Sequence, residues 1–124
     1  MIETIRISQR AKEQLIWLKR QTGITQWNVL CRWALCLSLA DPSPIGDFDD
    51  AADSNVEMRW EVFAGEFNSI YLCTIIERAK NEFSTINLKN ITSSTRRHIH
   101  RGIMKLSGAH DISKIINTVP KNHV

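Results

Sequence analysis

Two groups of side chains have the chemistry of metal ligands. One is a run of carboxylates at Asp47, Asp49, Asp50 and Asp53. Calcium loops of the EF-hand kind need oxygen ligands at fixed spacing, a central Gly and a final Glu, and this run lacks that pattern. The other is His98 with His100, which are two apart in an expected helix and therefore point about half a turn apart. We expect neither group to bind a metal, and we interpret the carboxylates as a solvated acidic loop.

The sequence contains no common catalytic motif. It has no Gly-rich phosphate loop, no paired Cys ligands, no HExxH and no GxSxG. The run Ser93-Ser94-Thr95 is typical of a helix cap. An enzyme would need a site assembled from the acidic loop and a basic helix, for example a metal-binding Asp47 or Asp49 beside Arg101. We therefore expect a binding protein without catalytic residues or cofactors.

Charge is segregated along the chain. There are 16 Lys and Arg and 13 Asp and Glu, for a formal net charge of +3. Counted from the sequence, residues 1–40 carry +4, residues 41–66 carry −7 and residues 67–124 carry +6. Two basic segments flank an acidic one, which permits a concentrated basic surface despite the modest total.

Most of the basic residues fall in two expected helices. In the first, they lie opposite an apolar stripe; in the second, they form a row with a spacing of four, and His98 adjoins that row. Such surfaces neutralise DNA phosphates. We predict that the basic residues of both helices, together with Arg6 of an N-terminal strand, bind DNA. The full set is Arg6, Arg10, Lys12, Lys19, Arg20, Arg97, Arg101 and Lys105.

The first forty residues predict a strand and two helices. Residues 3–7 alternate polar and apolar, Ser8 caps a helix that runs to about residue 21, and Gly23 ends it. A second helix covers residues 25–40, with Thr25 as its cap. This order resembles the ribbon-helix-helix DNA-binding proteins. The resemblance implies that two chains pair their strands, that Thr4 and Arg6 face outward, and that the start of the second helix, Thr25 to Trp27, holds phosphate.

The helix at residues 25–40 is apolar around almost its whole circumference. Its uncharged run, Trp33 to Ala40, is far shorter than a membrane span requires, so we expect no membrane partner. Other elements or other chains must cover this helix, and a short chain has little material with which to do so. We therefore predict a homo-oligomer.

We predict one domain over residues 1–124, mainly α with a minor β component: strand-helix-helix over 1–40, an acidic loop over 41–55, and a strand plus helices over 56–124. The expected elements of the last part are a strand at Val56 to Phe63, a helix from Ser69 to about Phe83, a connection at Thr85 to Asn90, a helix from Thr92 or Ser93, and a last helix near Asp111 to Thr118. Gly102 in mid-helix indicates close approach by another helix or a ligand backbone. The three cysteines, Cys31, Cys36 and Cys73, are interpreted as reduced core residues of a cytoplasmic protein.

Two later motifs extend the comparison to the whole chain. They are W-E-V-F-A-G-E-F at Trp60 to Phe67 and H-I-H-R-G-I at His98 to Ile103. Together with the basic N-terminal helix pair, they resemble the DndE family of bacterial DNA phosphorothioation proteins. The resemblance implies a small accessory protein, tetrameric, that binds DNA with a preference for nicked duplex and works with other proteins of the sulfur modification system. It implies no catalytic residues.

Three functions fit the sequence. The first is the DNA-binding accessory protein, the second is a ribbon-helix-helix repressor, and the third is an oligomerisation module whose basic surface receives an acidic protein partner. A repressor prefers one operator because it contacts base edges, whereas a structural binder responds to the form of the DNA. A protein-only module has little DNA affinity at physiological salt.

Overall fold

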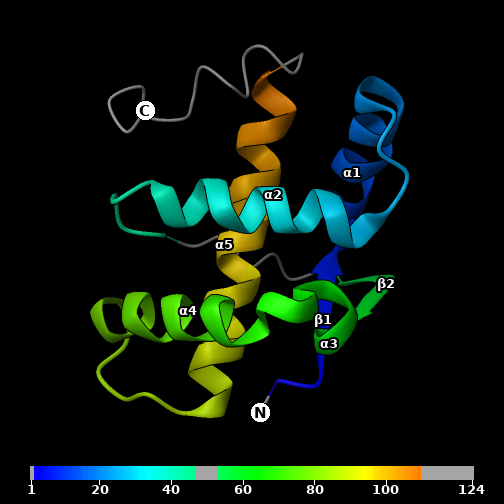
Figure 1. Cartoon of the computed structure of the whole chain (residues 1–124). Coiled ribbons are helices and arrows are strands. Elements are labelled where there is room, and N and C mark those ends of the chain that lie inside the picture. Colours follow the sequence, from blue (N-terminus) through cyan, green and yellow to red (C-terminus); the bar gives the residue numbers. More distant parts are fainter. Residues whose placement is uncertain (1, 47–52, 110–124) are drawn as a thin grey trace, which may run out of the picture.

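The computed structural model describes residues 2–46 and 53–109 (Figure 1). Its elements are β1 (Thr4–Ser8), α1 (Gln9–Thr22), α2 (Trp27–Ala40), β2 (Asp53–Arg59), α3 (Trp60–Ala64), a 3-10 turn at Gly65–Phe67, α4 (Asn68–Glu82) and α5 (Leu88–Ala109). The prediction of a mainly helical fold with a minor β component is confirmed. The helix predicted near residues 111–118 and residues 47–52 of the acidic loop lie outside the described residues.

The helix α5 is the axis of the fold. It runs through the molecule behind α2 and α4, and it also contacts α1 and β1 (Figure 1). Ile99, Ile103 and Leu106 supply the predicted inward stripe, and all three are buried. The sequence suggested α2 as the central helix, but α5 has neighbours on more sides because its polar residues, as well as its apolar ones, face other elements.

The two strands form an antiparallel pair within one chain. Ile5 lies opposite Met58, and Arg6 lies opposite Glu57. As predicted, the apolar residues of β1 are buried while Thr4 and Arg6 face outward. This pairing answers a question that the sequence left open, namely whether the strands join within a chain or between chains.

The outer edge of β1 is engaged by α5. The Arg6 carbonyl accepts a hydrogen bond from Arg96 Nη1 at 3.0 Å, and the Ser8 N–H donates to His100 Nε2 at 3.2 Å. A ribbon-helix-helix dimer needs a β1 edge that is free to pair with the partner's β1. The ribbon implied by that resemblance is therefore wrong for this chain.

Two element boundaries differ from the predictions. The strand predicted at residues 56–63 ends at Arg59, and α3 follows because Trp60, Phe63 and Ala64 bury one helical face. The helix predicted from Thr92 or Ser93 begins earlier, at Leu88, because Asn87 caps it: Asn87 Oδ1 accepts a hydrogen bond from the Asn90 N–H at 2.9 Å. Asn87 lies in the segment that we expected to be a connection.

The caps of the first two helices gave mixed outcomes. Ser8 Oγ accepts from the Ala11 N–H at 3.0 Å, and Gly23 ends α1 with a φ of 75°, so both predicted ends of α1 are confirmed. The predicted cap at Thr25 is wrong. The N-cap of α2 is Gln26, and its side chain makes no capping hydrogen bond.

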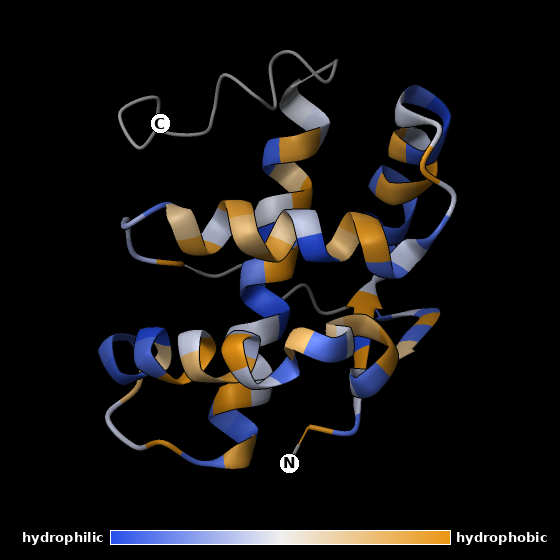
Figure 2. Ribbon diagram, viewed as in Figure 1, coloured by the Kyte–Doolittle hydropathy of each residue, from blue (hydrophilic) through white to orange (hydrophobic). Residues whose placement is uncertain are grey.

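The surface of α2 is more exposed than a core helix requires. Figure 2 shows hydrophobic residues on almost every turn of α2. Cys31 is buried, but Cys36 is exposed, as is Cys73 of α4, so the prediction of core cysteines holds for Cys31 alone. All three thiols are free, as predicted. Within residues 2–46 and 53–109, no helix is long and apolar enough to cross a membrane.

Candidate nucleic-acid interface

The outer face of α1 carries the first predicted basic group. Ala11, Leu15 and Leu18 turn inward, which places the basic residues of the helix on the opposite side. Arg10 and Arg20 are exposed, and neither has an ion pair or hydrogen bond with any other described residue. Their guanidinium groups are therefore available to an external anion.

The two lysines of α1 are held by neighbouring elements. Lys12 Nζ donates to Asn55 Oδ1 of β2 at 2.7 Å. Lys19 Nζ lies 3.5 Å from the ring centroid of Trp27, a cation–π contact that leaves its charge unneutralised. Neither lysine has a carboxylate partner among the described residues. The α1 face therefore keeps its positive charge.

The start of α2 adjoins this face. Trp27, under Lys19, is the first residue of α2. The first turn contains no acidic residue, and the N-cap side chain does not satisfy its N–H groups. A helix N-terminus carries a partial positive charge and unpaired N–H donors, which favour anions. The predicted phosphate position at Thr25 to Trp27 thus lies beside the Lys19 ammonium. Its donors are backbone N–H groups, and Thr25 does not cap them.

Arg6 lies on the sheet and is paired with a carboxylate. Its Nη2 lies 2.6 Å from Glu57 Oε2, and its Nη1 donates to the Ser54 carbonyl at 3.0 Å. The carboxylate neutralises this guanidinium locally. Arg6 is accordingly a weaker candidate for a phosphate contact than Arg10 or Arg20.

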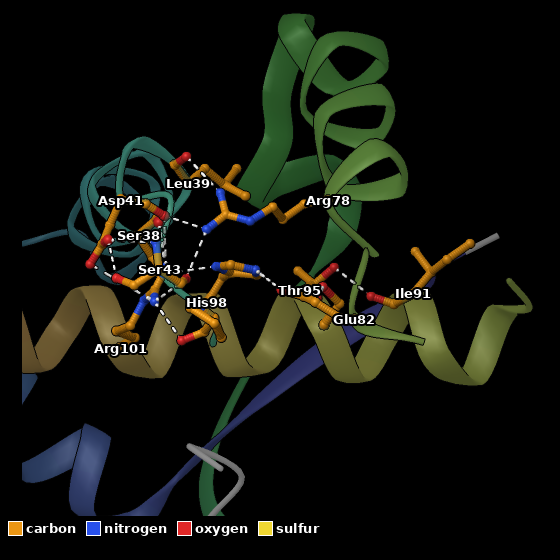
Figure 3. A network of polar contacts seen from close by, with 12 residues as sticks. Ser38, Leu39, Asp41, Ser43, Arg78, Glu82, Ile91, Thr95, His98 and Arg101 are labelled. Atoms are coloured by element: carbon orange, nitrogen blue, oxygen red, sulfur yellow. Dashed lines mark hydrogen bonds and ion pairs between the residues drawn. The ribbon is translucent and has the colours of Figure 1, made fainter. Parts of the chain in front are cut away.

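The predicted basic row on α5 is not an exposed surface. Arg101 is 4% exposed. It donates from Nε to Ser38 Oγ at 2.8 Å, from Nη2 to the Ser38 carbonyl at 2.7 Å and from Nη1 to the Ser43 carbonyl at 3.0 Å (Figure 3). The expectation of an outward Arg101 is wrong, because the end of α2 has carbonyl groups without helical partners and Arg101 binds them.

Arg78 of α4 binds the same segment from another side. Its Nη1 donates to the Leu39 carbonyl at 2.9 Å, and its Nη2 reaches the carbonyls of Asp41 and Ser43 (Figure 3). Two guanidinium groups thus hold the end of α2. Sequence reasoning missed Arg78, since nothing in its spacing indicates a carbonyl partner about forty residues away.

His98 was expected beside the basic row, and it is buried instead. Its Nδ1 lies 2.7 Å from Ser38 Oγ, and its Nε2 lies 2.7 Å from Glu82 Oε2. Ser94 Oγ donates to the other oxygen of Glu82 at 2.5 Å. Burial lowers the pKa of His98, and the hydrogen bond with Glu82 opposes that shift. A neutral imidazole satisfies every partner, because Arg101 donates to Ser38 Oγ and leaves the Ser38 proton for His98 Nδ1.

Ser38, His98 and Glu82 have the order of a hydrolytic triad, but they cannot serve as one. Ser38 and His98 are 0% exposed, so no substrate can reach the hydroxyl. Moreover, Arg101 already donates to the oxygen that would attack. The network joins α2, α4 and α5 and is structural.

The remaining two residues of the α5 row are partly engaged. Lys105 Nζ lies 2.8 Å from Asp41 Oδ2. Arg97 is half-buried, with its guanidinium carbon 5.6 Å from the Phe83 ring centroid, and its Nε has no hydrogen-bond partner in the described part of the chain. No group of three or more His, Cys, Asp or Glu side chains that could hold a metal occurs among the described residues.

A family model described as DNA sulphur modification protein DndE matches residues 4–114. This chain belongs to the DndE family. The family resemblance found in the sequence is thereby confirmed. The fold is also similar to that in a crystal structure of DndE from Escherichia coli B7A, described as involved in DNA phosphorothioation modification; the TM-score is 0.66 and the identity 21%, over 84% of this chain and 96% of that one. No curated protein matches the chain.

Proposed function

We propose that this DndE family protein is a DNA-binding accessory component of the DNA sulfur modification system, that it binds duplex DNA, with nicked duplex preferred, and that it acts as a homo-oligomer. The observation that carries the proposal is the α1 face, where Arg10 and Arg20 have no partner among the described residues and Lys19 contacts Trp27 at the uncapped start of α2. Cations without internal partners release counterions when they bind phosphate, which drives association.

The same geometry favours recognition of the DNA backbone over recognition of bases. A repressor of the ribbon-helix-helix type reads bases with a two-stranded ribbon built from two chains. Here β1 pairs with β2, and α5 engages its other edge. Positive charge on one helix face, with a helix N-terminus beside it, contacts phosphates and carries no direct sequence information.

The oligomer is supported by an apolar surface over α2, α3 and α4. Trp33 is 45% exposed, and Ile70 is 63% exposed; Val62 and Phe67 are also more than half exposed. A groove of about 340 Å³ runs between α2 and α4 and is lined by Val29, Arg32, Trp33, Cys36 and Tyr71. Exposed apolar surface of this kind marks a contact with another molecule. A second copy of the chain carries the same apolar surface and can cover it.

Duplex binding as a function of salt tests the proposal. We compare the wild type with Arg10→Ala/Arg20→Ala on intact, nicked and unrelated duplexes. Loss of two phosphate contacts is expected to lower the magnitude of the log–log salt slope by about two. The matched control is Arg59→Ala/Lys80→Ala, which removes two cations, one of β2 and one of α4, that are already paired with carboxylates. Equal slopes for the wild type and the α1 variant would contradict the assignment to α1.

The third function is tested in the same assay. An oligomerisation module for an acidic protein partner has no reason to bind DNA at physiological salt. Absence of wild-type binding at about 150 mM salt, with binding regained only far below it, would favour that module.

A further inference from the structure

An apolar side chain lies among the cations of α1. Ile16 is 36% exposed. Lys12 lies four residues before it, and Lys19 and Arg20 lie three and four residues after it. Residues with these spacings are neighbours on the surface of a helix. Ile16 therefore has three cations of the predicted DNA-binding set as neighbours.

Ile16 is not part of the buried stripe of α1. Ala11, Leu15 and Leu18 form that stripe, and each of them is at most 3% exposed. About one helical turn separates Ile16 from Arg20, which is exposed on the same side of α1. A ligand that binds Arg20 on this side therefore meets the exposed part of Ile16 as well.

The lysines beside Ile16 are held at their charged ends. Lys12 Nζ donates to Asn55 Oδ1 of β2, and Lys19 Nζ lies over the Trp27 ring of α2. These contacts direct both lysines toward neighbouring elements, and Ile16, which lies between them along the helix, keeps exposed surface. A duplex whose phosphates are attracted by these cations is brought against Ile16.

An isoleucine side chain has no favourable contact with a phosphate, but it can pack against the face of a base. In an intact duplex, stacking covers these faces. Architectural DNA-binding proteins insert apolar side chains, isoleucine among them, between base steps, and unstacking opposes that insertion. Because a nick interrupts one strand, the step at the nick bends and unstacks more easily than a continuous step. An apolar side chain therefore gains more from a nicked duplex than from an intact one.

We propose that Ile16 determines the preference for nicked duplex by packing against the base face that opens at the nick. This inference rests on the proposed function, because it concerns the same ligand and the same face of α1. The surrounding cations bind the phosphates of both duplex forms. Ile16 adds a contact that depends on the form of the DNA and carries no charge, so it changes selectivity without changing the number of counterions released.

The test uses the full chain and two duplexes of about 30 base pairs with the same sequence, one of them nicked at its centre. Ile16→Ala is expected to weaken binding of the nicked duplex by about fivefold and of the intact duplex by less than about twofold, since the lost contact is apolar and forms at the opened step. The salt slope is expected to stay that of the wild type on both duplexes. Thermal unfolding verifies the fold, and alanine should not lower stability at an exposed helical position.

The matched control is Ile86→Ala. Ile86 is 38% exposed and lies in the connection between α4 and α5, so this exchange removes the same atoms at nearly the same exposure outside α1. We expect it to leave the ratio of nicked to intact affinity unchanged. Ile16→Leu keeps an apolar side chain of the same volume and is expected to keep the wild-type ratio.

A fluorescent base beside the nick reports the contact directly. Aminopurine, an adenine analogue, is quenched while it is stacked in a duplex. Saturating wild-type protein is expected to raise its fluorescence, because the step opens around Ile16. Saturating Ile16→Ala protein is expected to raise it less. A change in α1 that only weakened phosphate binding would leave the fluorescence of the saturated complex unchanged.

The outcomes separate the two proposals. A lower ratio of nicked to intact affinity in Ile16→Ala alone, with an unchanged salt slope, supports the role of Ile16. An unchanged ratio in that variant, or an equal loss on both duplexes, overturns this role and leaves the proposed function intact. Wild-type protein that binds both duplexes equally removes the nick preference together with the role of Ile16. Wild-type protein that binds neither duplex at low salt overturns both proposals.

Discussion

Gly102 of α5 lies directly against the backbone of Ala34 in α2. A Cβ atom built on Gly102 would lie 1.8 Å from the Ala34 carbonyl oxygen and 2.5 Å from its Cα. The obstacle is a buried backbone and not a flexible side chain, so the contact cannot relax locally. The close approach predicted from a glycine in mid-helix is confirmed, and it brings α2 near enough for Arg101 to reach the end of that helix.

We expect Gly102→Ala to destabilise the fold by about 3 kcal/mol or more, because α2 and α5 must separate to admit the methyl group. Urea unfolding followed by circular dichroism measures the loss. Gly108→Ala in the same helix is the control. Among residues 2–46 and 53–109, no atom lies within 4 Å of the Cβ position at Gly108, so alanine is expected to stabilise by about 0.5–1 kcal/mol. Equal stabilities for the two variants would contradict the backbone contact.

His98 is expected to make the fold sensitive to acid. Its pKa is lowered from 6.5 by burial, and Arg78 and Arg101 also oppose its charged form, whereas Glu82 favours it. The unfolded chain therefore takes up the proton at a higher pH than the folded chain. The contribution of His98 to stability is complete above about pH 6.5 and declines as the pH falls toward the folded pKa, by at most about 1.4 kcal/mol per pH unit.

Urea unfolding at about pH 7.5 and about pH 5.5 measures this sensitivity. His98→Gln is expected to be less stable than the wild type at the higher pH but to lose less on acidification, which separates His98 from the other histidines. The same loss in both proteins would show that His98 does not cause the acid sensitivity.

Arg101→Ala is expected to lower the free energy of unfolding by about 3 kcal/mol or more, since it removes a buried guanidinium that donates to Ser38 Oγ and to the Ser38 carbonyl and leaves a cavity beside the end of α2. Arg97→Ala is the comparison in the same helix, and its cost is expected to be about 1 kcal/mol or less, since its contact is a cation–π pair with Phe83. Thermal unfolding of the two variants provides the measurement. An Arg101→Ala protein of wild-type stability with weakened DNA binding would instead restore Arg101 to the interface.

Trp33→Glu and Ile70→Glu are each expected to lower the oligomeric state, because a charge placed at an apolar contact is costly to bury. Both residues are exposed in the single chain, so the fold itself should persist, unlike with substitutions at the buried Leu35. Leu88→Glu, at the 50% exposed start of α5, is the control. Multi-angle light scattering at micromolar concentration reports the mass, and an unchanged mass in both α2 and α4 variants would remove this surface from the interface.

Features set by local physics were predictable from the sequence. The alternation in β1, the Ser8 cap and the Gly23 end of α1 depend on residues within one turn of each other, and the structure has all three. The inward stripe of α5 followed from its spacing in the same way. Boundaries failed where an unexpected local group competed, as with the Asn87 cap that starts α5 early.

Which way a polar face points was decided by the tertiary structure. The sequence by itself determined that Arg97, Arg101 and Lys105 share one side of a helix, and that the N-terminal helix carries a basic face. It could not determine that α2 ends beside Arg101 and that Asp41 lies beside Lys105, because these partners are about sixty residues away. The carbonyls at the end of α2 need donors, and Arg101 supplies them at the cost of its own exposure. Within the part of the chain that the structure describes, the α1 face has no such neighbour, and Arg10 and Arg20 stay exposed there.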